Sequence, residues 1–543
     1  MSKILNKIFQ HKILLLILVL AFILRIYDIN NNPKSMYGDE LTLVYDAYSL
    51  LKTGQDQKGQ AWPLFFSMGG GRPAGYIYAT IPFAALFGPT AQAARAVSVL
   101  SGVGIVLLIY LVSKILILRK VGLLAALTAA ITPWELNLSR GAFESHFALF
   151  LSMLGLYFFL LAQKRQVFYL FSALSFLLAM QAYLTFVLSV PLFMGILVYF
   201  FKDKLRFSPI TAASILILIL SLSFSIYTSV SRGSKDRVGN LFIYNQSEYQ
   251  NIIADKVRRE RLFSPASPQL VLRLHNRYLE FTNLFFQNYL NSFGLDFLIL
   301  NGDKNIRHNP TSLGQIYWVG FPLMAFGLIM LFKNYKKSLA LLFGWLLISP
   351  LPSSLVGQPH AIRSSFMLPP LIILMGAGLY YLVKLKGQKL RWFKLTLFIL
   401  FLVELPIFLY RFYLLSPALN TLFWSYSAKI ASEVALENKG KYQYIILSTS
   451  IPDMEFAYPV YAKIEPKEVH YTNLHKTNFG EHQFLKYGNI YLGSIPSTRV
   501  RQILRSLEGP VLYLGPIEDR GLVDNEQITR NKDESPLFVV STK

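Results

Sequence analysis

Residues 13–26 read ILLLILVLAFILRI, an apolar run that follows a basic amino terminus. No small-residue cleavage site comes after it, so we expect a retained first membrane span and not a removed signal peptide. Runs of similar length recur along the chain, and a helix needs about 20 apolar residues to cross the hydrocarbon core. The sequence therefore predicts an integral membrane protein that crosses the bilayer many times.

About eleven such segments occur before the tail of the chain, which predicts an α-helical polytopic domain over residues 1–415. The expected spans are residues 11–29, 93–115, 121–138, 144–162, 167–183, 185–201, 209–229, 315–332, 338–355, 365–383 and 393–412.

Composition supports this class of protein and excludes others. Of 543 residues, 53% are hydrophobic and 15% aromatic, which is more than a water-soluble fold can keep off its surface. The net charge of +23 alone would fit a nucleic-acid-binding protein, but the charges lie between apolar runs, so we expect no nucleic-acid partner. The absence of cysteine excludes disulfides, thiolate catalysis and a cysteine-based zinc site.

Basic residues gather in alternate connecting loops, which indicates the topology. By the positive-inside rule these loops face the cytoplasm, and the odd number of spans then places the amino terminus inside and the tail outside a plasma membrane. The carboxylate-bearing loops share the outer side, where we expect the chemistry. The basic loops are at residues 3–12, 114–120, 164–165, 202–206, 333–337 and 384–391.

Three regions are expected outside the membrane. Residues 30–92 contain two amphipathic stretches, at 41–51 and 74–87, that fit a position along the interface. The polar loop at 231–314 is too long to be a mere connector. Residues 416–543 combine a helical stretch with short strand-like runs, which predicts a small extracytoplasmic α/β domain.

The sharpest motif is MYGDEL at residues 36–41, just beyond the first span. Two interpretations have equal weight. Asp39 and Glu40 can point into a membrane-surface cleft as catalytic acids, or Asp39 can cap the following helix while Glu40 complements its dipole.

Two further motifs carry arginine on the expected outer side. GGGRPAGY at residues 69–76 places Arg72 beside a glycine turn, where its guanidinium fork can meet phosphate oxygens or simply lipid headgroups. QPHAIRSS at residues 358–365 makes Arg363 the only basic residue of an outer turn, against the positive-inside trend, which indicates an anionic partner.

The outer turn at residues 133–146 reads PWELNLSRGAFESH. Arg140 and Glu144 are four positions apart, so we expect them on one helix face, where they can form a salt bridge at a span end. Glu144 and His146 enter the next apolar run, where polar groups are costly and often functional.

These motifs, together with Ala-Ala-Arg at residues 93–95, resemble the membrane glycosyltransferases that include the protein O-mannosyltransferases and the lipid A aminoarabinose transferase. The resemblance is dense over residues 35–145, is limited to His360, Arg363 and Pro369 further on, and does not extend to the tail.

The resemblance implies the C-type glycosyltransferase fold, a polyprenyl-phosphate sugar donor and inverting transfer to a lipid, glycan or protein hydroxyl on the outer face. Asp39 matches the family's acidic base and Glu40 its neighbour, which orients the acceptor or a metal. Glu144 matches an acid of the second outer loop, although relatives carry Asp there. The donor phosphate would meet Arg72, Arg140 and Arg363, and the substrate Tyr76 and His360.

No cofactor is certain from the resemblance, because some relatives use a divalent metal and others do not. Asp39 and Glu40 would be its ligands here.

Two other functions fit the same features. A transporter or flippase for lipid-linked sugars also needs many spans, and Glu404, an acid within a predicted span, fits that class. A ligase or polymerase of preassembled glycans would share the outer-face chemistry.

Overall fold

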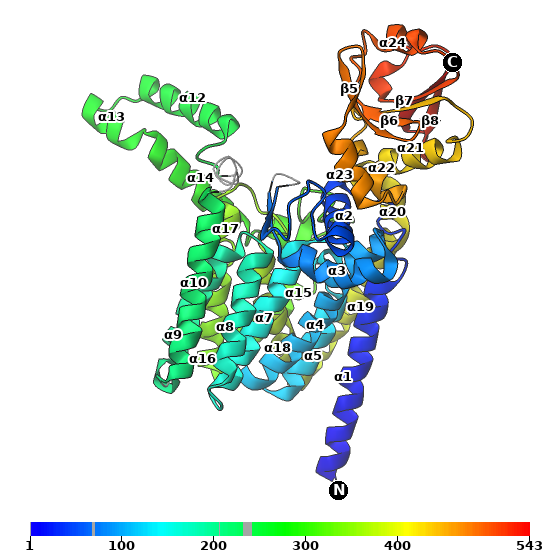
Figure 1. Ribbon diagram of the computed structural model, residues 1–543. Coiled ribbons are helices and arrows are strands. Elements are labelled where there is room, and N and C mark those ends of the chain that lie inside the picture. Colours follow the sequence, from blue (N-terminus) through cyan, green and yellow to red (C-terminus); the bar gives the residue numbers. More distant parts are fainter. Residues whose placement is uncertain (1, 68–70, 206, 232–241) are drawn as a thin grey trace. The chain divides into compact units, whose positions relative to one another are not determined.

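The computed structural model describes residues 2–67, 71–205, 207–231 and 242–543 (Figure 1). It divides into two compact units. The helical unit comprises Met1–Tyr27, Gly70–Gly75 and Ser98–Leu409, and the tail unit comprises Asp28–Gly69, Tyr76–Val97 and Tyr410–Lys543.

Each expected span overlaps at least one helix. The helices are α1 (Ser2–Ile26), α4 (Ala91–Leu116), α5 (Arg119–Ile131), α7 (Glu144–Ala162), α8 (Phe168–Ala182), α9 (Phe186–Phe201), α10 (Pro209–Ser231), α15 (Gly320–Asn334), α16 (Lys336–Ile348), α18 (Leu368–Lys384) and α19 (Gln388–Tyr410). By length and composition, six helical segments of the described chain can cross a membrane, and further apolar helices are shorter. The chain is a multi-pass membrane protein.

Two of the expected spans are divided. The segment at 121–138 breaks into α5 and the short α6 (Pro133–Leu138), and the segment at 338–355 breaks into α16 and α17 (Leu351–Ser354). Pro133 disfavours helical backbone at Thr132, which is extended, so α5 ends there and α6 begins. Ser349 and Pro350 keep helical backbone angles, so the second break has another cause.

Two glycines allow helices α15 and α18 of the helical unit to pack closely against each other. A Cβ on Gly378 of α18 would lie 1.7 Å from the carbonyl oxygen of Leu323, and one on Gly327 of α15 would lie 2.1 Å from that of Leu374. Glycine is therefore required where α15 and α18 cross, as is common between membrane helices. Figure 1 shows α7, α8, α9 and α10 running alongside one another in the same unit.

The outer loop predicted at 231–314 is largely helical where it is described. It contains α12 (Ser247–Phe263), α13 (Pro268–Leu274), α14 (Arg277–Asn291) and the π-helical turn η3 (Asp296–Leu300). Ile253, Val257 and Phe281 form a small core between α12 and α14. Residues 232–241 lie outside the described part.

The tail forms the predicted α/β fold around a seven-stranded sheet of order β4-β5-β6-β3-β7-β9-β8. Its centre is parallel, β6-β3-β7, and its outer strands are antiparallel. The strands are β3 (Tyr444–Ser448), β4 (Thr477–Phe479), β5 (His482–Tyr487), β6 (Ile490–Gly493), β7 (Val511–Gly515), β8 (Glu526–Arg530) and β9 (Pro536–Thr542). The helices beside it are α20 (Ser416–Leu419), α21 (Tyr426–Glu437), α22 (Met454–Tyr461), α23 (Pro466–Leu474) and α24 (Val500–Ser506).

The tail unit begins far earlier in the chain than the boundary expected at residue 416. Helix α2 (Gly38–Thr53) and helix α3 (Gly75–Phe87) belong largely to it. The hydroxyl of Tyr45 on α2 donates to the carbonyl oxygen of Ile464 at 2.7 Å, and the imidazole of His470 lies 2.6 Å from the carbonyl oxygen of Asp56. These polar contacts, together with the buried face of α2, join the first outer loop to the tail.

Candidate functional site

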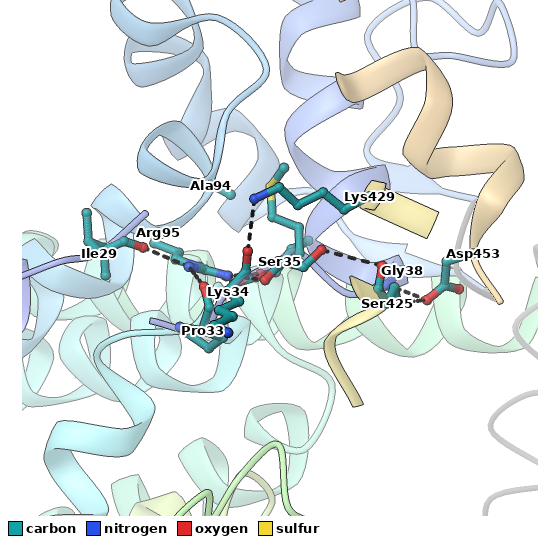
Figure 2. Close-up of polar contacts among 12 residues, drawn as sticks. Ile29, Pro33, Lys34, Ser35, Gly38, Ala94, Arg95, Ser425, Lys429 and Asp453 are labelled. Atoms are coloured by element: carbon teal, nitrogen blue, oxygen red, sulfur yellow. Dashed lines mark hydrogen bonds and ion pairs between the residues drawn. The ribbon is translucent and has the colours of Figure 1, made fainter. Parts of the chain in front are cut away.

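Glu40 is held by a buried arginine of α4. The Arg95 guanidinium donates to both carboxylate oxygens of Glu40, at 3.0 and 2.8 Å, and both side chains are fully buried. The same guanidinium donates to the carbonyl oxygens of Ile29, Pro33 and Ser35 (Figure 2). Both oxygens of Glu40 are thus engaged in a structural ion pair, so the expectation that Glu40 orients an acceptor or helps to bind a metal does not fit.

Asp39 is not the cap of its helix. The N-cap position of α2 is Tyr37, whose side chain makes no capping bond, and Asp39 is the second helical residue and is half-buried. The amide N–H of Gly38 instead donates to the carboxylate of Asp453 at 3.0 Å, which also accepts from the hydroxyl of Ser425 (Figure 2). Because Asp453 accepts from the first amide of α2, the interpretation of Asp39 as the helix cap does not fit.

Tyr76 does not fit the expected substrate contact. Its side chain is fully buried within the tail unit, and its hydroxyl donates to the carbonyl oxygen of Ala94 at 3.0 Å. The ring and hydroxyl therefore fasten α3 to α4. A tyrosine in an amphipathic stretch suggested an interfacial role because its burial was not visible in the sequence.

The helical unit brings Arg72 and Glu144 together. A guanidinium nitrogen of Arg72 lies 3.5 Å from a carboxylate oxygen of Glu144, and the two side chains are 6% and 17% exposed. Arg72 lies in the short strand β2 (Arg72–Pro73), and Glu144 is the first residue of α7. Two of the expected site residues, separated by 72 positions, therefore form one partly accessible ion pair. Gly69 and Gly70 of the glycine motif lie outside the described residues.

Arg140 was expected to share a helix face with Glu144 and to contact the donor phosphate, and the structure places it differently. It lies in the turn between α6 and α7, so it does not share a helix face with Glu144. Its buried guanidinium donates to the carbonyl oxygens of Leu24 and Arg25, at 3.1 and 2.9 Å. These are among the last carbonyls of α1, which need donors. Binding of the donor phosphate by Arg140 does not fit this placement.

A buried charge network behind that turn was missed by the sequence interpretation. Glu135 accepts from the Arg25 guanidinium and lies 3.0 Å from the His146 imidazole, and all three side chains are fully buried. Arg25 also donates to the carbonyl oxygens of Ala21 and Ala130. The network explains how His146 enters an apolar helix, because Glu135 supplies its partner.

The turn that carries His360 and Arg363 lies between α17 and the 3₁₀ turn η4 (Ser365–Met367). His360 is close to Asp303 and His308 of the preceding outer loop. Burial lowers the pKa of both imidazoles, and the positive charge of Arg363 lowers it further. Arg363 therefore lies near this cluster.

Glu404, the acid within a predicted span, has hydrogen-bond partners in the structure. Its carboxylate accepts the amide N–H groups of Trp318 and Val319, at 2.7 and 3.4 Å, immediately before α15 begins. It caps the start of α15, which removes the feature that favoured a transporter.

Comparison with known proteins supports the resemblance. The family model for dolichyl-phosphate-mannose-protein mannosyltransferases matches residues 72–227, a range that includes Arg72 and Glu144. The fold is that of ArnT from Cupriavidus metallidurans, with a TM-score of 0.55, 12% identity, and 99% of this chain and 98% of that chain covered. The chain has the fold of ArnT, and its segment at residues 72–227 matches the mannosyltransferase family.

A second ArnT structure, bound to undecaprenyl phosphate, has a TM-score of 0.54 and 12% identity, with 97% of each chain covered. The archaeal oligosaccharyltransferase AglB from Archaeoglobus fulgidus has a TM-score of 0.45 and 14% identity over 84% of this chain, which spans 64% of AglB. No protein of curated function matches the sequence. The family match thus covers residues 72–227, and the likeness to ArnT shows the fold of the whole chain.

Proposed function

We propose that this protein transfers a sugar from a polyprenyl-phosphate carrier to an acceptor hydroxyl on the outer face of the plasma membrane. The observation that carries the proposal is the ion pair between Arg72 and Glu144, because it lies within the segment that matches the family and joins two expected site residues. The undecaprenyl phosphate bound to a structurally similar ArnT supports a carrier of this class.

The reaction is a single inverting displacement. The acceptor oxygen bonds to the anomeric carbon while the bond from that carbon to the phosphate oxygen breaks, and the electron pair leaves with polyprenyl phosphate. Asp39 accepts the hydroxyl proton as the general base. This role rests on the resemblance and on the finding that Asp453, not Asp39, caps α2.

The positive charge of Arg72 stabilises the departing phosphate. Phosphate leaves readily, so positioning and cations near its oxygens matter more than a strong general acid. Glu144 holds the planar guanidinium in one orientation, which favours two-point contact with phosphate oxygens. Arg363 is proposed as a second cation for the same anion.

The test uses purified protein in lipid nanodiscs with undecaprenyl-phosphate monosaccharides as donors. The proposal predicts release of undecaprenyl phosphate that depends on the protein, and accumulation of one lipid-phosphate monosaccharide in cells that lack it. Accumulation of a lipid-linked oligosaccharide instead would favour a ligase or polymerase. An unchanged set of lipid-linked sugars in those cells, with no release in nanodiscs, would contradict the proposal.

A further inference from the structure

Three side chains with metal-binding atoms meet in the helical unit. Asp303 and His308 belong to the outer loop after η3, and His360 belongs to the turn after α17. One ligand atom from each lies within 4.8 Å of the others. The group is the arrangement of two histidines and one carboxylate that zinc and other divalent transition metals accept.

The distances between the two imidazole nitrogens and the Asp303 carboxylate are longer than ordinary hydrogen bonds. The Nδ1 atoms of His308 and His360 lie 3.4 and 3.8 Å from the same carboxylate oxygen of Asp303. Hydrogen bonds between such groups are about 2.7–3.2 Å long. Two ligand atoms on a tetrahedral zinc ion with bonds of about 2.05 Å are about 3.3 Å apart, so the first separation already fits and the second needs a shift of a few tenths of an ångström.

Both imidazoles present a buried nitrogen that lacks a conventional partner. Within the part of the chain that the structure describes, neither Nδ1 has a hydrogen-bond partner, and both atoms are shielded from solvent. Buried polar atoms of this kind are rare, and a metal ion would give both of them a partner.

The carboxylate is fixed by the backbone around it. Its two oxygens accept the amide N–H groups of Asn305 and Ala361, at 2.8 and 2.6 Å. The ring of Phe143 packs edge-on against His308, with 5.6 Å between the ring centres. Such support from neighbouring groups is typical of metal ligands, because it fixes their orientation before the ion arrives.

We propose that Asp303, His308 and His360 bind a divalent transition metal, with zinc as the best fit to the donor set. The ion would join the outer loop to the turn that carries Arg363. Three protein ligands leave at least one position for water or an anion. The proposal is independent of sugar transfer, since the site can hold its ion whatever the protein glycosylates.

The first test measures binding of Zn²⁺ alone to the full-length protein in detergent after removal of metals with a chelator. The parent should bind one zinc ion per chain and unfold at a higher temperature with zinc than without it. His308→Gln and His360→Gln should each weaken binding by more than about 100-fold, because even changes to groups behind the ligands cost about 10–100-fold.

His275→Gln is the matched control. Its Nδ1 lies 2.9 Å from the carboxylate of Glu260 in the same outer loop, a normal hydrogen bond away from the cluster. This variant should bind zinc as the parent does. Zinc binding by the His308→Gln and His360→Gln variants equal to that of the parent would overturn the proposal, as would a parent without bound zinc.

A second measurement needs no variant, so it does not depend on how the substitutions fold. X-ray absorption at the zinc edge reports which atoms bind the ion in the parent. The spectrum should show two imidazole nitrogens and carboxylate oxygen at about 2.0–2.2 Å. A spectrum of bound zinc without imidazole ligands would contradict metal binding at this cluster.

Discussion

The carboxylate of Asp453 accepts the amide N–H of Gly38 at 3.0 Å, although the two residues are 415 positions apart in the sequence. A Cβ on Gly38 would lie 2.5 Å from a carboxylate oxygen of Asp453, so the contact requires glycine at that position. The helix that carries Asp39 and Glu40 is thus started by a residue of the tail. The tail domain therefore belongs to the structure that positions the candidate base.

Asp453→Ala should destabilise the tail unit by about 0.5–2 kcal/mol, the usual loss for a helix cap. Asp453→Asn should stay near the parent, because the amide oxygen can still accept from Gly38. Thermal unfolding of the purified variants measures the difference. The exposed Glu508 is the control, and its change to Ala should have little effect. If Asp453→Ala and Glu508→Ala unfolded alike, the capping role would be refuted.

Removing the charge of Glu40 should damage the fold before it affects chemistry. Glu40→Ala leaves the Arg95 guanidinium buried without its counter-ion, and such a change costs about 3–5 kcal/mol. We expect a large fall in the unfolding temperature, followed by loss of activity as protein is lost. A Glu40→Ala protein as stable as the parent but inactive would instead support the catalytic role that its sequence motif suggested.

Arg72→Gln should raise the KM for the polyprenyl-phosphate sugar at least about tenfold, since one charged contact to the phosphate is lost. Glu144→Gln should have a smaller effect in the same direction, because it loosens the orientation of Arg72 and leaves its charge in place. Arg165→Gln, a change to an exposed arginine in another loop, is the control and should leave the KM unchanged. Donor KM values equal to that of the parent for both Arg72→Gln and Glu144→Gln would reject the phosphate site.

The proposed topology places the amino terminus in the cytoplasm and the tail outside. A reporter that is active only outside the cytoplasm, fused after Lys543, should be active. A fusion in the basic turn after α15, at Lys333, should be inactive, because that loop is expected inside. An inactive reporter after Lys543 with an active one at Lys333 would invert the orientation and remove the outer-face assignment.

Hydropathy was sufficient to predict the apolar helices, because membrane spans are defined by local composition, and the break at Pro133 follows from local backbone sterics. The partners of charged residues were not predictable in this way. Arg25 pairs with Glu135 across 110 positions and Glu40 with Arg95 across 55, and neither spacing leaves a periodic signal.

The same limit explains why the surroundings of several expected site residues were not predicted. Arg140 and Tyr76 each fitted a ligand role by residue type, but the structure uses them to bind backbone carbonyl oxygens. His360 was considered alone, and its grouping with Asp303 and His308 depends on contacts between two separate outer loops. A search for histidine and carboxylate pairs shared between predicted outer loops would have raised this cluster as a candidate.

The most direct test of the account is single-turnover transfer by Asp39→Asn, compared with the parent, from an undecaprenyl-phosphate sugar that the parent uses. The amide keeps the size of the side chain but does not act as a base, and loss of a positioned base lowers a rate by about 10²–10⁴-fold. Since Asp453 caps α2, the unfolding temperature should stay at the parental value. The account predicts a rate lowered by that factor in a protein as stable as the parent. A near-parental rate of transfer would contradict it.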